Sequence, residues 1–327
     1  MNGGSPIPVV DLHADLLWRM EGHPYDPLSE APGEHLDLPK LRAGGVALLG
    51  AAIYTPEGQS APLAAPPYAE RLLGILDALL CRSSGSLRQV RSRAEVSAAV
   101  RAPDPRGPAL LLTMEGVAPL AGEVAALDRF HGAGLRVLGL THNPRNAAGD
   151  GTGVPTAERR RGLTPFGRDL LRRMGDLGIV PDIAHLAEEA CGDLFDLARG
   201  PVICTHAGVR AVKDHWRNLS DAQVRAVAAT GGFVGIDAYP GHVARGERGT
   251  LEDVALHMEH VASLAGPGAV GVGADFAGFD GPVVEGMEDA SGYTRLAAFL
   301  LGRGWRREQV AAAFHGNALR VLESVLQ

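Results

Sequence analysis

Cysteine is scarce in this sequence, and the three cysteines are far apart. Cys81, Cys191 and Cys204 form no C-x-x-C pair in the 327 residues, so the sequence indicates neither a disulfide framework nor a cysteine metal site. Scattered single thiols are typical of proteins in reducing compartments. Aromatic residues are also few, at 5% of the chain against 46% hydrophobic residues in total. The core must therefore be built mainly from Ala, Leu and Val.

Long apolar runs and excess positive charge are also missing. The longest apolar run, VALLGAAIY at 46–54, is well short of the roughly 20 residues that cross a bilayer. The first residues, MNGGSPIP, lack the basic and apolar regions of a secretory signal, and the last residues carry no lipidation signal. The formal net charge of −7 disfavours nucleic acid or an anionic membrane as a partner. We expect a cytoplasmic protein.

Short apolar runs recur along the chain, bounded by Gly or Pro and separated by helix-like stretches. The runs are continuous rather than alternating, which is typical of parallel strands that are covered on both faces. Eight of them are present, at 8–13, 45–54, 108–115, 135–142, 178–185, 201–206, 232–239 and 269–275. Eight strands alternating with helices predict an α/β fold, a (β/α)8 TIM barrel. A doubly wound open sheet is the alternative, because the sequence alone does not show closure.

Helix-start signals separate several of these runs. They are Thr164 before Pro165, Ser220 with Gln223, and Thr250 with Asp253, and each is an N-cap pattern. Residues 54–68 are rich in Pro and Ala, which predicts a long surface loop rather than a linker between domains. We therefore expect one domain over residues 1–327.

Ionisable residues gather where the predicted strands end. In a barrel enzyme the carboxyl ends of the strands build the active site. A single histidine at such a position is most often an ordinary core or loop residue. Here four of the chain's twelve histidines fall at strand ends, together with three carboxylates, and scatter explains this poorly. The residues are His13, Asp15, Glu115, His142, His185, His206 and Asp275.

The strand-end residues predict a site for two metal ions. His13 and Asp15 are two positions apart, so in a strand they share a face and both can reach one cation. His185 and His206 end neighbouring strands and would hold a second ion. Glu115 ends a strand between the others and is the natural bridge, since two catalytic metals roughly 3.5–4 Å apart need a shared carboxylate. Imidazole and carboxylate ligands suit Zn²⁺, with Mn²⁺ or Co²⁺ as substitutes.

Asp275 follows the last predicted strand, which would lie beside the first strand in a closed barrel. A carboxylate at this position can take a proton from water and pass it to a leaving amine. The plainer alternative is that Asp275 only supports a ligating histidine through a hydrogen bond.

Beyond these individual residues, the chain resembles the membrane (renal) dipeptidase family, peptidase family M19, over nearly its whole length. Each matching stretch is modest alone, but their order and spacing are specific. The H-x-D pair at the first strand also differs from the H-x-H that amidohydrolases usually have there. The stretches are HAD (13–15), MEGV (114–117), LTHNPRNAAGDG (140–151), GLTPFGRDLLRRMGDLGIVPDIAH (162–185), PVICTHAGVRAV (201–212), RNLSDAQVRAVAATGGFVGI (217–236), VGVGADF (270–276) and GNALRV (316–321).

The resemblance implies a TIM barrel of the metal-dependent hydrolase type that hydrolyses dipeptides with two zinc ions per chain, and it also implies a homodimer. The metal ligands that it implies are His13, Asp15, Glu115, His185 and His206, with Glu115 bridging the two ions. By the same resemblance, His142 polarises the scissile carbonyl, Arg217 binds the free carboxylate of the substrate, and Asp275 is the acid/base.

The sequence departs from the family pattern near the substrate rather than at the metal ligands. The usual DFDG is DFAG here, with Ala277 in place of the second aspartate, and the segments AAIYTPEG (51–58) and AHLA (184–187) also differ. These departures leave room for hydrolysis of another small amide or lactam. A non-catalytic metal-binding homologue is a further alternative, against which the intact Asp275 argues.

Overall fold

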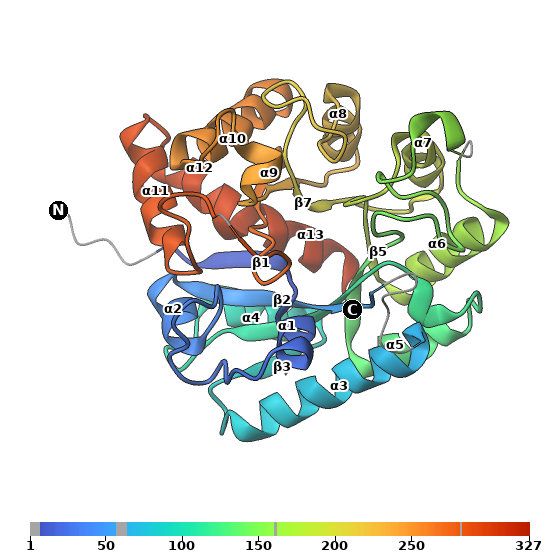
Figure 1. Ribbon diagram of the computed structural model, residues 1–327, viewed down its shortest axis with the longest axis horizontal. Helices are drawn as coiled ribbons and strands as arrows, with labels where there is room; N and C mark the ends of the chain where they lie inside the picture. The colour runs from blue at the N-terminus through green and yellow to red at the C-terminus, as the bar shows by residue number, and fades with distance from the viewer. Residues whose placement is uncertain (1–6, 57–63, 160–161, 282) are drawn as a thin grey trace.

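Strands and helices alternate along the chain, and the helices lie around the strands (Figure 1). The structure is a computed structural model that describes residues 7–56, 64–159, 162–281 and 283–327. The strands are β1 (Val9–Ala14), β2 (Val46–Tyr54), β3 (Arg88–Val90), β4 (Ala109–Glu115), β5 (Leu135–Gly139), β6 (Val180–Asp182), β7 (Cys204–Ala207), β8 (Val234–Ile236) and β9 (Val270–Val272).

Thirteen α-helices connect and cover the described strands. They are α1 (Leu16–Gly22), α2 (Leu38–Ala43), α3 (Ala65–Arg82), α4 (Arg93–Arg101), α5 (Ala126–Ala133), α6 (Pro165–Leu177), α7 (Glu188–Leu197), α8 (Asp221–Ala229), α9 (Pro240–Val243), α10 (Leu251–Ala265), α11 (Gly292–Gly302), α12 (Arg307–Ala311) and α13 (Asn317–Val325). A π-helical turn, Ala312–Gly316, joins α12 to α13. Within the described residues, no helix has both the length and the apolar character needed to cross a bilayer.

All strand pairs in the two sheets are parallel. The larger sheet has the order β1-β2-β4-β5-β6, with β3 paired to β4 at the side, and the smaller has the order β7-β8-β9. The prediction of an α/β fold with parallel strands is confirmed. β3 was not predicted, because its residues Arg-Gln-Val give no apolar run.

Single parallel bridges join the two sheets at both of their outer edges. Asp182 of β6 pairs with Ile203 just before β7, and Ala14 of β1 pairs with Phe276 after β9. The backbone hydrogen bond from Ile183 N to Ile203 O is 2.9 Å long, and that from Asp15 N to Phe276 O is 3.1 Å. The eight predicted strands therefore stand next to one another in chain order, with isolated bridges rather than ladders at the two junctions.

The strands are buried on both faces, as their continuous apolar runs predicted. All seven residues of β4 are buried. One core lies between the strands and helices α4 and α13, and a larger core packs the strands against the other helices. Leu111 of β4 belongs to the smaller core, and Glu115, four residues further along the same strand, shares its face. The packed core thus ends where the polar residues begin.

The predicted helix starts are confirmed at all three positions. The Thr164 hydroxyl accepts a hydrogen bond from Gly167 N over 3.1 Å at the start of α6. Ser220 and Thr250 form capping boxes at the starts of α8 and α10. The predicted surface loop at 54–68 is wrong at its end, because α3 begins at Ala65 with two prolines in its first turn, where proline is tolerated. Residues 57–63 of that loop lie outside the described residues.

The N-cap of α6 supports a prediction about stability. Thr164→Ala removes the hydroxyl that caps the helix, and such a loss typically costs about 0.5–2 kcal/mol. We expect a lower midpoint of urea unfolding, measured by circular dichroism. Thr164→Ser keeps the hydroxyl and should stay close to wild type. A Ser variant as unstable as the Ala variant would show that the hydroxyl is not what stabilises this helix.

Candidate metal centre and active site

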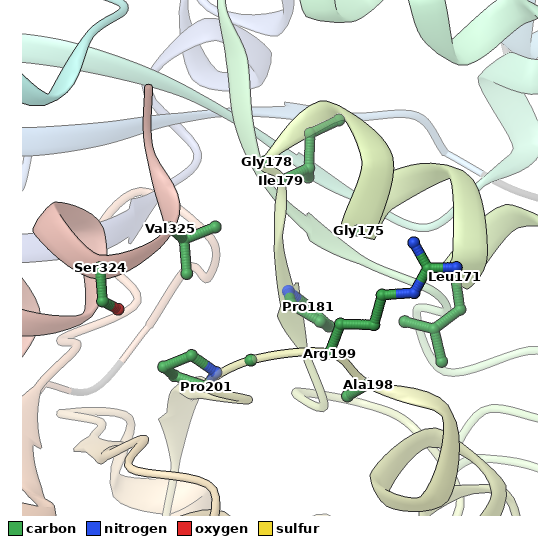
Figure 2. A pocket seen from close by; sticks show the side chains of 11 residues that line it. Leu171, Gly175, Gly178, Ile179, Pro181, Ala198, Arg199, Pro201, Ser324 and Val325 are labelled. Carbon is green, nitrogen blue, oxygen red and sulfur yellow. The ribbon is translucent and has the colours of Figure 1, made fainter.

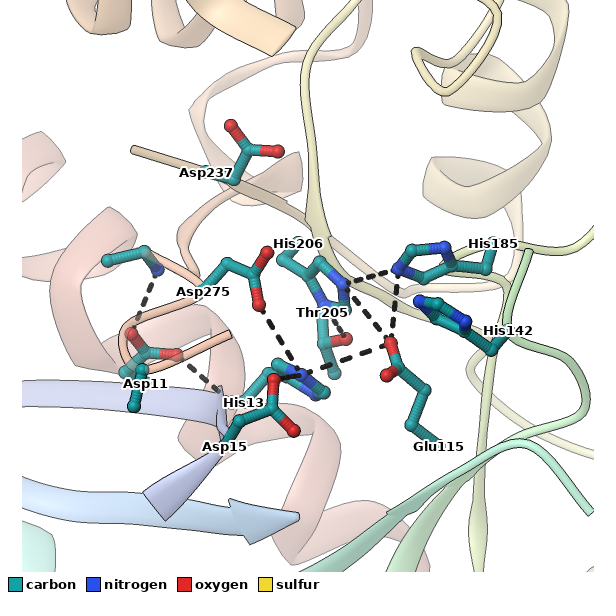
Figure 3. Close-up of polar contacts among 12 residues, drawn as sticks. Asp11, His13, Asp15, Glu115, His142, His185, Thr205, His206, Asp237 and Asp275 are labelled. Carbon is teal, nitrogen blue, oxygen red and sulfur yellow. Dashed lines mark hydrogen bonds and ion pairs between the residues drawn. The ribbon is translucent and has the colours of Figure 1, made fainter. Parts of the chain in front are cut away.

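The strand-end residues predicted from the sequence meet in one cluster (Figure 3). His13 lies within β1 and Asp15 directly after it, and their side chains approach to 3.4 Å between Nε2 and Oδ2. The same nitrogen is 3.6 Å from Asp275 Oδ1 and 3.9 Å from Glu115 Oε1. One imidazole is thus close to three carboxylates that come from β1, β4 and the segment after β9.

Glu115 connects this group to two further histidines. Its Oε1 is 3.1 Å from His185 Nε2 and 3.4 Å from His206 Nε2, and these two nitrogens are 3.0 Å apart. His206 lies within β7, whereas His185 lies three residues after the end of β6. The sequence placed His142, His185 and Asp275 at strand ends, but each lies three residues beyond its strand, in the loop.

Hydrogen bonds determine which nitrogen of each histidine carries the proton. His185 Nδ1 is 2.8 Å from Asn143 Oδ1, which can only accept, so Nδ1–H donates and Nε2 is unprotonated in the neutral ring. His206 Nδ1 is 2.9 Å from the Thr205 hydroxyl, which itself donates to the buried Asp182 carboxylate. Nδ1–H of His206 therefore donates as well. Two unprotonated Nε2 atoms then face each other at hydrogen-bond distance with no proton between them.

These residues fit a pair of cations. Ligand atoms lie within 4.8 Å of one another in the sets His13–Asp15–Glu115, Glu115–His185–His206 and His13–His206–Asp275. The first two sets share Glu115, as a bridging carboxylate requires. Within the described part of the chain, the buried atoms His13 Nε2, Asp15 Oδ1 and Glu115 Oε1 have no hydrogen-bond partner. Buried charged groups are ordinarily paired or coordinate a metal.

The electrostatics of the cluster also favour a bound cation. Burial lowers the pKa of His13, but Glu115, Asp15 and Asp275 more than offset this effect and raise it to about 10. Burial holds the pKa values of His185 and His206 well below the usual range, so their rings are neutral and can bind a metal. The carboxylates that draw a proton to His13 would draw a divalent cation instead.

Two of the carboxylates have raised pKa values for the same reason. Burial raises the pKa of Asp275 to about 8 and that of Glu115 well above its usual range, and the charge of Asp15 adds to both. Like charges that are buried together cannot all ionise without compensation. A pair of divalent ions would supply that compensation.

The backbone is strained around the site. His185, Asp275 and Ala277 have φ values of 62°, 58° and 69°, in the left-handed region that costs an L-residue about 1–2 kcal/mol. Gly278 is required by close approach, because a Cβ there would lie 2.5 Å from Asp275 Oδ1 and 2.6 Å from Asp15 Oδ2. Strained residues persist where the surrounding structure holds them, and they cluster at functional sites.

Asp11 holds the backbone beside His13 and Asp275 through hydrogen bonds, but it was not among the predicted site residues. Its fully buried carboxylate accepts hydrogen bonds from His13 N at 3.0 Å, from Ala274 N at 2.9 Å and from the Tyr293 hydroxyl. It thereby ties the strand that carries His13 to the segment that carries Asp275. The alternating D-x-H-x-D at 11–15 was the sequence signal for it.

Three other supporting residues were missed as well. Asn143 follows His142 directly, Thr205 precedes His206, and Asp182 stands three residues before His185. Thr205 N and Ala184 N both donate to Asp182 Oδ1, over 2.9 and 2.8 Å. Their only sequence signal was that each lies within three residues of a predicted site residue, where the hydrogen-bond partners of ligating histidines are common.

A cavity of about 400 Å³ opens over the cluster. Its lining combines polar site residues with the side chains of five Trp, Tyr and Phe residues. The fourteen lining residues are Asp15, Trp18, Tyr54, Glu115, His142, Asn143, His185, His215, Trp216, Tyr239, His242, Asp275, Gly278 and Phe279. A second cavity, of about 180 Å³, lies beside β6 and the end of α13 (Figure 2). Arg199 is the only charged residue in that lining, and it pairs with Asp176 at 2.7 Å. The cavity over the cluster is the candidate active site, because Asp15, Glu115 and His185 line it.

His142 lines this cavity but belongs to none of the ligand sets. Its ring centre is 4.5 Å from that of His185 and 4.9 Å from that of Tyr54. Burial lowers the pKa of His142 to about 4. The ring is therefore neutral at pH 7 and has one N–H to donate.

Arg217 lies deeper than a loop residue normally would. Its side chain is 1% exposed, and Nη2 donates to the His206 carbonyl oxygen over 2.8 Å. Its neighbours His215 and Trp216 line the cavity, whereas Arg217 lies against His206. Among the described residues, its Nε and Nη1 have no hydrogen-bond partner. Buried donors of this kind are costly to leave unpaired, so the guanidinium is suited to an incoming anion.

Comparison with known proteins identifies close similarity to metallopeptidases. Residues 5–327 match the model of the membrane dipeptidase family, peptidase family M19. An uncharacterised dipeptidase of Schizosaccharomyces pombe is 33% identical over 213 residues, which are 64% of this chain and 52% of that protein. The dipeptidase tcpJ of Claviceps purpurea is 33% identical over 66% of this chain and 51% of its own length. The chain thus spans about half the length of these curated relatives.

Two solved structures match over nearly their full length. A dipeptidase of family M19 has a TM-score of 0.89 at 29% identity, over 98% of this chain and 99% of its own. A metallopeptidase from Rhodobacter sphaeroides, solved with a phosphinate mimic of the dipeptide L-Ala-D-Ala, has a TM-score of 0.89 at 28% identity, over 98% of this chain and 100% of its own.

The hydrogen bonds of the cluster support a prediction about metal binding. The wild-type protein should carry close to two divalent ions per chain by elemental analysis. Thr205→Val removes the hydroxyl that orients His206, and loss of such a partner typically weakens metal affinity about 10–100-fold. Competition with a metal-binding dye measures that affinity.

Thr113→Val is the matched control. Thr113 is also buried and is also in a strand, but its hydroxyl has no partner among the described residues. This variant should keep wild-type affinity. Equal weakening by both substitutions would show that the Thr205 hydroxyl does not act through His206.

Proposed function

The chain belongs to the membrane dipeptidase family, peptidase family M19, and we propose that it is a metal-dependent dipeptidase with two zinc ions bridged by Glu115. The observation that carries this proposal is the pair of ligand sets that share Glu115, with unprotonated Nε2 atoms of His185 and His206 3.0 Å apart. We further propose that the chain forms one domain, a (β/α)8 barrel closed at the two bridged junctions. This closure would bring the ends of β1, β4 and β7 to one rim.

The proposed metal ligands divide into two sets. His13, Asp15 and Glu115 would hold one zinc ion, and Glu115, His185 and His206 the other, with Mn²⁺ or Co²⁺ as substitutes. When bound, such a pair supplies Lewis acidity and lowers the pKa of water toward about 7, which provides hydroxide at neutral pH.

Arg217 and His142 would position the substrate. The free N–H groups of Arg217 suit a bidentate, charge-assisted pair with the carboxylate of the dipeptide. His142 would donate its N–H to the carbonyl oxygen of the scissile bond as that oxygen becomes negative. A donor of this kind is typically worth about 10²–10³-fold in kcat.

Asp275 would move the proton. Its Oδ1 is 3.6 Å from His13 Nε2, at the edge of the ligand cluster, and it lines the cavity. It would take a proton from the attacking water and give it to the leaving amine as the C–N bond breaks. Burial raises its pKa, which suits a group that must hold a proton between the two transfers.

Asp275→Asn tests whether this carboxylate is the acid/base. The variant keeps the shape but cannot hold the proton, so kcat should fall about 10²–10⁴-fold while metal content stays near wild type. The assay is hydrolysis of a dipeptide panel with L and D second residues, on protein whose metal content has been measured. A loss of metal together with activity would make Asp275 a ligand, as its place in the set with His13 and His206 allows.

Arg217→Met tests whether the substrate class is free dipeptides. Breaking one partner of a buried charge pair costs roughly 2–5 kcal/mol, or about 30-fold to several thousand-fold in kcat/KM. The wild type should strongly prefer a dipeptide to its C-terminal amide, and in the variant this preference should largely disappear.

Arg210→Met is the control for that comparison. Arg210 lies in the same loop, but it pairs with Glu188 at 2.8 Å outside the cavity. It should leave the preference for the free carboxylate unchanged. An equal loss on dipeptide and amide in the Arg217 variant would contradict carboxylate binding and would favour hydrolysis of other small amides.

A further inference from the structure

A second histidine–carboxylate pair lies beside the cavity, apart from the proposed metal ligands. His242 is in α9 and lines the cavity. Its Nδ1 is 2.7 Å from Oδ2 of Asp237, which follows β8 directly and is fully buried. Neither residue is in a ligand set, and the proposed reaction uses neither.

The contact with Asp237 determines what the His242 ring can bind. Nδ1–H donates to the carboxylate, which leaves Nε2 as the second binding atom. In the described residues, Nε2 of His242 has no hydrogen bond, and Oδ1 of Asp237 is buried without a partner. With a proton on each nitrogen, the ring would donate Nε2–H to an anion, and the Asp237 carboxylate would be its counter-charge.

The ring is held rigidly in place. Asn218 Nδ2 donates to the His242 carbonyl oxygen over 2.8 Å. His257 accepts a hydrogen bond from Val209 N at Nδ1, so its Nε2–H donates to the Val243 carbonyl oxygen, 3.2 Å away. Both backbone carbonyls at this end of α9 are therefore anchored to the loop after β7 and to α10. These bonds fix the backbone that carries His242, and the Asp237 contact orients its ring; such support is typical of a binding residue.

The position of His242 relative to Arg217 identifies the part of the substrate that it would meet. His215 and Trp216 directly precede Arg217 and line the cavity, and the ring centres of His215 and His242 are 5.1 Å apart. In a dipeptide whose α-carboxylate binds Arg217, the C-terminal Cα is bonded directly to that carboxylate carbon. The side chain on that Cα would therefore face the His215–His242 wall.

His215 adds a donor to the same wall. Its Nδ1 accepts a hydrogen bond from Arg217 N over 3.2 Å, which places the proton of the neutral ring on Nε2. The wall thus offers ring N–H donors with a buried counter-charge behind them. Donors of this kind suit an anionic group better than an apolar one.

We propose that His242, held by Asp237, binds the side-chain carboxylate of dipeptides whose C-terminal residue is Asp or Glu. This inference rests on the proposed dipeptidase function and names the substrate class of that site. The side-chain carboxylate would accept a hydrogen bond from His242 Nε2–H while the α-carboxylate binds Arg217.

The test compares two nearly isosteric substrates that differ in charge, Ala-Asp and Ala-Asn, each with an L or a D second residue, and uses Ala-Ala as the reference. The zinc-loaded wild type should favour Ala-Asp over Ala-Asn by about tenfold or more in kcat/KM, because hydrogen bonds to charged groups are the stronger ones. In His242→Phe this ratio should fall to near one, while hydrolysis of Ala-Ala and metal content are retained.

A second variant keeps the inference testable if His242→Phe does not fold. Asp237→Asn still offers Nδ1–H an acceptor but removes the counter-charge, so it should lower the Ala-Asp to Ala-Asn ratio at unchanged metal content. His260→Phe is the matched control, because His260 Nε2 is also 2.8 Å from a carboxylate oxygen, on Asp221, between the outer helices α10 and α8. It should leave the ratio at the wild-type value.

The outcomes separate this inference from the proposed function. Two results would overturn the role of His242 and leave the dipeptidase function in place. One is hydrolysis of dipeptides by the wild type with no preference for Ala-Asp. The other is an equal loss of kcat/KM on all three substrates in His242→Phe. Failure of the zinc-loaded wild type to hydrolyse any dipeptide would overturn the dipeptidase function itself.

Discussion

The arrangement of the other ionisable side chains in this site depends on the Glu115 carboxylate. A carboxylate at the end of a fully buried strand lies within 3.4 Å of two histidine Nε2 atoms and 3.9 Å of a third. Hydrogen bonds at Nδ1 leave the first two rings without a proton to offer it. Such an arrangement is unfavourable in the absence of a cation. Two cations, as proposed above, would give each of these atoms a partner.

Much of the neighbouring structure maintains this arrangement at a cost in stability. Asp11 and Asp182 are buried carboxylates that hold the backbone and hydroxyl groups beside the ligands. His185 and Asp275 adopt left-handed backbone conformations, and Gly278 allows Asp15 and Asp275 to approach. None of these features improves packing of the core. They hold the side chains of the cluster in position, as the proposed metal centre and proton carrier require.

The lining of the cavity above the cluster contains two sets of residues with different proposed roles. The set formed by His142 and the ligand residues faces the bond that would be cleaved. The second set is His215, Trp216 and His242, and under the further inference these side chains would distinguish one C-terminal residue from another. The departures from the family pattern at Ala277 and in the loops leave the residues of the ligand sets unchanged. Selectivity can therefore vary in this fold while the chemistry stays the same.

The sequence alone was sufficient for the features that depend on local pattern. Continuous apolar runs predicted eight of the nine strands in the two sheets, because a strand buried on both faces needs apolar residues at every position. The ligand candidates could be named because each lies within three residues of such a run. The sequence did not predict β3, the bridged junctions between the sheets, the burial of Arg217 or the contact of His242 with His215. These features arise where segments far apart in the chain come into contact, as when the Asp11 carboxylate meets Ala274. Only the tertiary structure decides such contacts, since no local periodicity encodes which distant residue will be the neighbour.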